Sequence, residues 1–100
     1  MPLRKDDAKR LIRQLMQAGS FHLTPHARRE RDKDKLNDVD IVNVLRAGMV
    51  SDAEYENGEW RYQVRTQRIT VVVAFEPAPD EAEDENDVEL VVVTVWRATP

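Results

Sequence analysis

Arginines spaced to share one face of a strand are the residues of this sequence with the clearest chemical potential. Polar and apolar residues alternate from Glu59 to Thr66, so Arg61, Gln63 and Arg65 lie on one face of a predicted strand. Guanidinium groups bind phosphates through paired hydrogen bonds and stabilise the charge of a pentavalent phosphorane. Two further arginines are candidates for phosphate contact. Arg68 follows this strand closely in the sequence, and Arg97 ends the last predicted strand. The pattern allows RNA cleavage, although spacing alone favours the solvated face of an antiparallel sheet.

RNA cleavage also needs groups that move protons, and His26 is the first candidate. It lies in the stretch LTPHARRERDKDK, where Thr24 can cap a helix and Pro25 is tolerated in the first turn. His26 in this first turn could act as a general base, or it could only pack and hydrogen-bond. Three arginines of the same predicted helix are candidate nucleic-acid contacts: Arg28, Arg29 and Arg31.

Tyr62 is the second candidate for proton transfer. The alternation of the strand puts it on the face of Trp60 rather than on that of Arg61, so burial is the alternative to a place in the site. Trp60 and Trp96 could stack on nucleobases, but their alternation with valines also fits packing in the core or at its rim.

Chemistry that depends on a metal, a thiol or a serine triad is not predicted. The chain has no cysteine, and its three glycines are explained by helix ends and a turn rather than by a phosphate loop. His22 and His26 have i, i+4 spacing, but Pro25 argues against one helix that carries both. We therefore expect no metal and no cofactor.

The charges are segregated along the chain. Residues 1–36 hold ten Lys/Arg and five Asp/Glu, whereas residues 77–100 hold one and seven. A basic half of this kind is a recognised hint of a polyanionic partner. The acidic residues gather in 77–88, where we expect a mobile loop. No apolar run approaches the roughly 18 residues of a membrane span, and no secretory signal is evident, so a cytoplasmic protein is expected.

The elements that must position these residues form a single α+β domain over residues 1–100. Ala8, Leu11, Ile12, Leu15 and Met16 form the apolar stripe of an amphipathic helix, which Gly19 closes. A short extended piece follows, then a helix from Pro25 to about Lys35 and one from Asn37 or Asp38 to Gly48. Four strands are predicted, with a hairpin turn at Asn57-Gly58: Met49 to Glu56, Glu59 to Thr66, Arg68 to Phe75 and Glu89 to Arg97. We expect a four-stranded, mainly antiparallel sheet with the N-terminal helices packed on one face.

Four short motifs in this order resemble a family of small bacterial proteins of unknown function. They are His26-Ala27 followed by arginines, a helix that ends at Gly48, the hairpin strand from Gly58 to Tyr62, and the final strand segment from Thr94 to Trp96. That family looks like a relative of the RelE/ParE toxin superfamily. The first helix with its glycine and short strand is also similar to the MqsR-type messenger-RNA interferase toxin.

The resemblance implies a RelE-like fold and the activity of a metal-independent endoribonuclease in a toxin–antitoxin pair. It implies RNA and an antitoxin protein as partners, and the ribosome is a further candidate partner. By position it supports His26, Arg61 and Tyr62 as catalytic residues; Arg65 and Arg97 are added from the predicted sheet. The alternative is a non-catalytic module of the same fold that binds nucleic acid or protein, because the strands lack the lysines that interferases commonly use.

Overall fold

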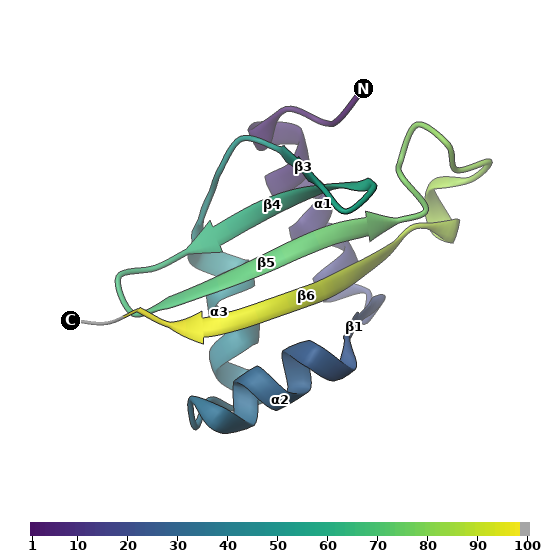
Figure 1. Ribbon diagram of the computed structural model, residues 1–100. Helices are drawn as coiled ribbons and strands as arrows, with labels where there is room; N and C mark the ends of the chain where they lie inside the picture. The colour runs from purple at the N-terminus through teal and green to yellow at the C-terminus, as the bar shows by residue number, and fades with distance from the viewer. Residues whose placement is uncertain (99–100) are drawn as a thin grey trace.

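The computed structural model describes residues 1–98, which form three helices and a six-stranded sheet (Figure 1). The helices are α1 (Lys5–Gln17), α2 (Pro25–Lys33) and α3 (Asp38–Ala47). The strands are β1 (Phe21–Leu23), β2 (Met49–Val50), β3 (Glu54–Glu56), β4 (Glu59–Arg65), β5 (Ile69–Glu76) and β6 (Glu89–Arg97). A short 3-10 helix, η1 (Glu85–Asp87), lies before β6. The predicted α+β class is confirmed.

The sheet is antiparallel except at one edge. Its strand order is β1-β6-β5-β4-β2, and β3 also pairs with β4. β1 runs parallel to β6, while β4, β5 and β6 pair antiparallel with their sequence neighbours. β5 is buried along nearly its whole length, in accordance with its β-branched sequence and central position.

The expected number of four strands was too low. The stretch predicted as one strand from Met49 to Glu56 is divided into β2 and β3, which pair with opposite ends of β4. The short piece Phe21–Leu23 adds the parallel strand β1 against Leu90, Val91 and Val92. Strands of two or three residues carry too little periodicity to be recognised in a sequence, and only their long-range pairing defines them.

Helices α1 and α3 cover one face of the sheet and leave the other without a helix (Figure 1). The predicted stripe of α1 enters the core, where Ala8 and Ile12 are fully buried. α3 begins with Asn37, whose side chain accepts a hydrogen bond from the Asp40 amide in a reciprocal capping box. Because α1 and α3 pack on the same face, the side chains on the opposite face of the sheet remain available for a ligand.

Helix α2 lies along the edge of β6 that β1 leaves free (Figure 1). At its start, the Thr24 hydroxyl donates to the Val93 carbonyl at 3.0 Å and accepts from the Ala27 amide at the same distance. At its end, the Asp34 carboxylate accepts a hydrogen bond from the backbone N–H of Arg97 at 2.7 Å. The helix therefore covers an edge that could otherwise pair with another chain, and the strand fixes where α2 begins.

The acidic stretch 77–88 connects β5 to β6 through turns and the short helix η1. Asp84 accepts a hydrogen bond from the Asn86 amide and thereby caps η1. Val88, at the end of the stretch, is buried in the core. The loop is thus anchored where it enters β6; its mobility stays a prediction.

Candidate functional site

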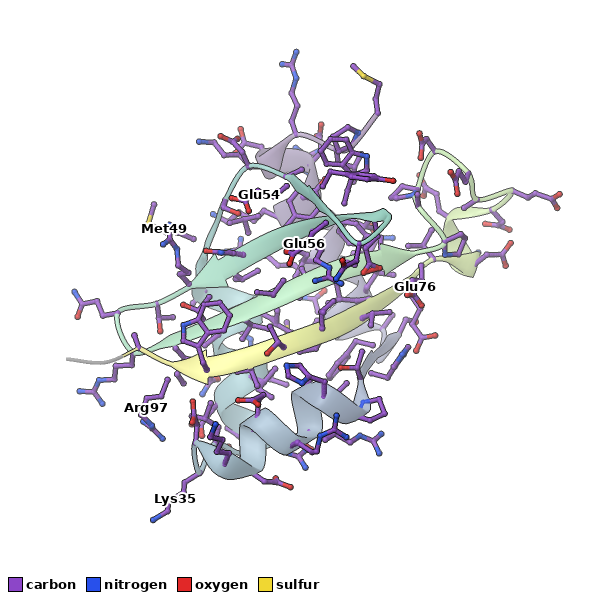
Figure 2. All side chains as sticks on the ribbon, in the orientation of Figure 1. Lys35, Met49, Glu54, Glu56, Glu76 and Arg97 are labelled. Carbon is purple, nitrogen blue, oxygen red and sulfur yellow. The ribbon has the colours of Figure 1, made fainter. Side chains whose placement is uncertain are left out.

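The helix-free face of the sheet carries the arginine row that the sequence indicates. In β4, Arg61, Gln63 and Arg65 point to this face, opposite Ala74, Val72 and Thr70 of β5. On the far side of β5, the same face carries Thr94 and Trp96 of β6. On the near side of β4, β3 places Glu54 directly across from Arg61 and Glu56 across from Glu59. Figure 2 shows Glu54 and Glu56 along the β3 edge of this face.

A depression of about 230 Å³ lies in the middle of this face and involves β3, β4, β5 and β6. Its lining consists of Ser51, Glu54, Glu56, Arg61, Tyr62, Gln63, Val72, Thr94 and Trp96. Ser51 is held in place by two hydrogen bonds of 2.9 Å with the backbone of Gln63. Trp96 is 37% exposed and offers a flat apolar surface at one end of the depression. A nucleobase could stack there, since aromatic side chains commonly bind bases in this way.

Arg61 is the only guanidinium among the described residues that line the depression, and carboxylates compensate its charge. Its Nε donates to Oε2 of Glu59 at 3.2 Å, and its Nη1 lies 3.7 Å from Oε2 of Glu56. The Arg61 side chain is 17% exposed, so these partners hold it in a partly dry environment. An arginine next to a carboxylate combines a phosphate-binding group with a potential proton acceptor.

Tyr62 lies on the opposite face of the sheet from Arg61, as the alternation of β4 predicts. It is 2% exposed, and its hydroxyl donates a 2.7 Å hydrogen bond to the Leu3 carbonyl. Burial raises the pKa of Tyr62 above its ordinary value. The Tyr62 side chain therefore lies in the core, on the face opposite the Arg61 side chain, although Tyr62 also contributes to the lining of the depression.

Arg65, Arg68 and Arg97 lie at the end of the sheet away from Arg61. Arg97 pairs with Ile69, five positions along β5 from the partner of Arg61, which corresponds to about 17 Å along the strand. Its guanidinium hydrogen-bonds the Asp34 carbonyl at the end of α2, and Figure 2 shows it on the same side as Lys35. Arg65 and Arg68 are exposed near the β4–β5 turn. These arginines do not join Arg61 in one site.

Helix α2 divides its basic residues between two flanks. Ala27 is fully buried, and because successive helix residues are about 100° apart, His26 and Arg28 lie on opposite sides of it. Arg28 lines a hollow of about 420 Å³ together with Arg31 and with Asp38 of α3, so its flank faces the helix layer. His26 is exposed on the other flank, and we infer from the position of Arg28 that this flank lies toward the helix-free side of the sheet.

His26 and Arg61 nevertheless do not contact each other. β4 and β6 are separated by β5, hence by about 10 Å, and α2 lies beyond β6. A substrate would have to lie between the two residues, above Val72 and Thr94. This separation defines the distance that any chemistry shared by His26 and Arg61 must bridge.

The three arginines predicted as nucleic-acid contacts are not equivalent. Arg31 donates to Asp38 at 2.7 Å and to Asp32 at 3.0 Å. The hydrogen bonds with these two carboxylates raise the pKa of Arg31, most strongly through Asp38. Arg28 and Arg29 are exposed and are the better placed of the three to meet a polyanion.

The carboxylates beside Arg61 are the main feature of the site that we did not predict from the sequence. Glu54 and Glu56 alternate in the sequence, which is a signal for one shared strand face. Their position opposite Arg61 and Glu59 follows from the two-residue turn at Asn57-Gly58, which sets the register of β3 with β4. In residues 1–98, no group of three or more His, Cys, Asp or Glu side chains is arranged to hold a metal ion.

Comparison with protein-family models, with curated proteins and with solved structures found no match for this chain. None of the helices in residues 1–98 combines the length and the apolar character that crossing a membrane requires.

Proposed function

We propose that this protein is a metal-independent endoribonuclease of the toxin type that binds single-stranded RNA across the helix-free face of its sheet. One observation carries the proposal: Arg61 lies in a depression on that face with the Glu59 carboxylate 3.2 Å from its Nε. The resemblance of the chain to RelE-like toxins supports the same function. The RelE-like fold itself, an antitoxin partner and a cytoplasmic location belong to this proposal.

The reaction would be an internal transesterification of RNA. Glu59 takes the proton of a 2′-hydroxyl, whose oxygen attacks the adjacent phosphorus. Arg61 binds the non-bridging oxygens and stabilises their growing negative charge. The bond to the 5′ oxygen breaks, and this oxygen takes up a proton. The products are a 2′,3′-cyclic phosphate and a free 5′-hydroxyl, and no redox partner is needed.

His26 is the candidate donor of the proton to the departing 5′ oxygen. It lies on the flank of α2 that faces the helix-free side, where the hydrogen bonds of Thr24 to β6 fix the start of the helix. The scissile phosphate would lie above Val72 and Thr94, between Arg61 and His26. Trp96 would then stack with a neighbouring base.

The first test is cleavage of a labelled single-stranded RNA by the purified protein without added metal. Arg61→Ala should lower the rate about 100-fold to 1,000-fold, which is typical for loss of one group that stabilises transition-state charge. Arg68→Ala removes an exposed arginine outside the depression and serves as the matched control, with a change below about twofold. Cleavage without ribosomes would also separate direct action from ribosome-dependent action.

A second test isolates the role of His26. An RNA with sulfur in place of the bridging 5′ oxygen has a leaving group that needs no proton. His26→Ala should therefore slow cleavage of the normal RNA but not that of the sulfur-substituted RNA. If both substrates are slowed equally, His26 contributes to binding or to the structure of α2 rather than to proton transfer.

A non-catalytic binding module is the second candidate, and the ion pairs of Arg61 favour it. Because Glu56 and Glu59 compensate the Arg61 charge, a polyanion must displace them before it binds there. In this case Arg28 and Arg29 of α2 would carry most of the affinity. RNA would bind with a strong salt dependence but would not be cleaved, and Arg28→Glu with Arg29→Glu should abolish binding. Unchanged binding in that variant would rule out this version.

A further inference from the structure

A cleft of about 290 Å³ lies at one end of the sheet, and it shares Tyr62 with the lining of the arginine depression. Three segments form its walls: residues 1–3, the hairpin of β3 and β4, and residues 76–81 after β5. Figure 1 shows the N-terminal segment and the loop after β5 at the same end of the molecule, and Figure 2 shows Glu76 at that end. We call it the aromatic cleft, because four of its lining side chains are aromatic: Tyr55, Trp60, Tyr62 and Phe75.

The aromatic residues are arranged in two pairs. Tyr55 and Trp60 pack edge to face, with ring centroids 5.1 Å apart, and both are partly exposed. Tyr62 and Phe75 lie in the core with centroids 5.6 Å apart. The hydroxyl of Tyr62 is occupied by the Leu3 carbonyl, so the floor of the cleft offers apolar ring surface. The exposed pair is the part that a ligand can reach.

Carboxylates surround this aromatic surface. Glu59, Glu76, Asp80 and Glu81 line the cleft, and no lysine or arginine is among the described residues that line it. Asp80 has one cationic neighbour, the amino group of Met1 at 3.1 Å, but both groups are exposed. Residues 77–88 carry four more acids, Glu83, Asp84, Glu85 and Asp87, which do not line the cleft. Phosphates would be repelled here, so the cleft is unsuited to RNA.

We propose that the aromatic cleft is a docking site for a partner protein and takes a segment in which lysine or arginine alternates with apolar residues. A cationic side chain can lay its methylene stem on the Trp60 ring and place its charge near Glu76 and Glu81. The cavity, the exposed aromatic pair and the charge complementarity are three separate observations that agree on this occupant. The inference goes beyond the proposed ribonuclease and does not depend on it.

The probe is a capped pentapeptide, Ala-Lys-Leu-Lys-Ala, and its uncharged control is Ala-Gln-Leu-Gln-Ala. Binding to the full chain is followed by calorimetry and by chemical shifts of the two tryptophan side chains. The lysine peptide should bind and shift the signal of Trp60, while the glutamine peptide should bind at least tenfold more weakly. Trp96, which lies on the helix-free face of the sheet, should be unaffected.

Paired variants separate the cleft from general attraction by the acidic loop. Glu76→Gln with Glu81→Gln should weaken binding of the lysine peptide about tenfold. Glu83→Gln with Asp87→Asn removes the same charge from acids that do not line the cleft, and it should change binding less than twofold. Trp60→Leu should weaken binding about fivefold, whereas Trp96→Leu should not.

Three results would overturn the proposal. Equal losses in the two charge variants would mean diffuse attraction, and an unchanged affinity in Trp60→Leu would exclude the aromatic surface. Absence of binding by the lysine peptide at millimolar concentration would exclude this occupant. Because RNA cleavage is measured separately, failure here leaves the ribonuclease proposal standing, and the reverse also holds.

Discussion

Gly48 provides a sharp test of how α3 is joined to the sheet. A Cβ atom at this position would lie 2.7 Å from the Val44 carbonyl oxygen, 2.9 Å from Val64 Cγ1 and 3.1 Å from the Arg65 carbonyl oxygen. Two of these atoms belong to the backbones of α3 and β4, so neither can move away without shifting a core element. Overpacking of this kind costs roughly 1–3 kcal/mol, and the rigid neighbours place Gly48→Ala near the upper end.

Thermal unfolding followed by circular dichroism measures this cost. For a domain of this size, about 3 kcal/mol corresponds to a fall in Tm of roughly 12–24 °C. Gly19→Ala is the matched control, because its φ of +74° is strained for alanine but no atom lies within 4 Å of the added Cβ. It should cost about 1–2 kcal/mol. The reasoning is refuted if Gly48→Ala unfolds at the temperature of the wild type, or above that of Gly19→Ala.

Three further predictions concern stability. Asn37→Ala removes the cap of α3 and should lower the free energy of unfolding by about 1 kcal/mol in urea titrations, whereas Asn43→Ala on the exposed side of α3 should be nearly neutral. Asp34→Ala removes the carboxylate that accepts the backbone N–H of Arg97 in β6, and it should lower the free energy of unfolding by about 1–2 kcal/mol. Asp32→Ala removes only an exposed ion pair with Arg31 and should lower it by less than about 1 kcal/mol. Equal losses in the two variants would contradict the role of Asp34 at the edge of β6. Because the folded state raises the pKa of Tyr62, the neutral phenol favours folding, and this contribution should be lost as pH rises above the unfolded value of about 10. Tyr62→Phe should therefore lose less stability between pH 8 and pH 11 than the wild type does, as measured by urea midpoints.

Features that depend on neighbouring residues were predictable from the sequence. The alternation of β4 separates Arg61 from Tyr62, and the structure has them on opposite faces of the sheet. Thr24 and Asn37 cap their helices as their types and positions indicate. Gly48 ends α3 as expected, but its φ is −72° and therefore needs no glycine. The position needs glycine because a Cβ atom would collide with backbone atoms of α3 and β4. Local periodicity and capping thus carry most of the information on the elements.

Features that depend on long-range register were not predictable. The position of α2 on β6 rests on hydrogen bonds from Thr24 and Asp34 to residues more than sixty positions away. The aromatic cleft combines residues 1–3 with the hairpin and with residues 76–81. No short segment of sequence contains any of these arrangements.

The most direct test of the central claim is a time course of RNA cleavage by the wild type, Arg61→Ala and Glu59→Gln in the presence of a chelator. The account predicts fragments that end in a 2′,3′-cyclic phosphate with the wild type. Both variants should react at least about 100-fold more slowly, since one loses charge stabilisation and the other loses the proton acceptor. Intact RNA with the wild type, or equal rates in all three proteins, would contradict the claim that Arg61 and Glu59 form an RNA-cleaving site.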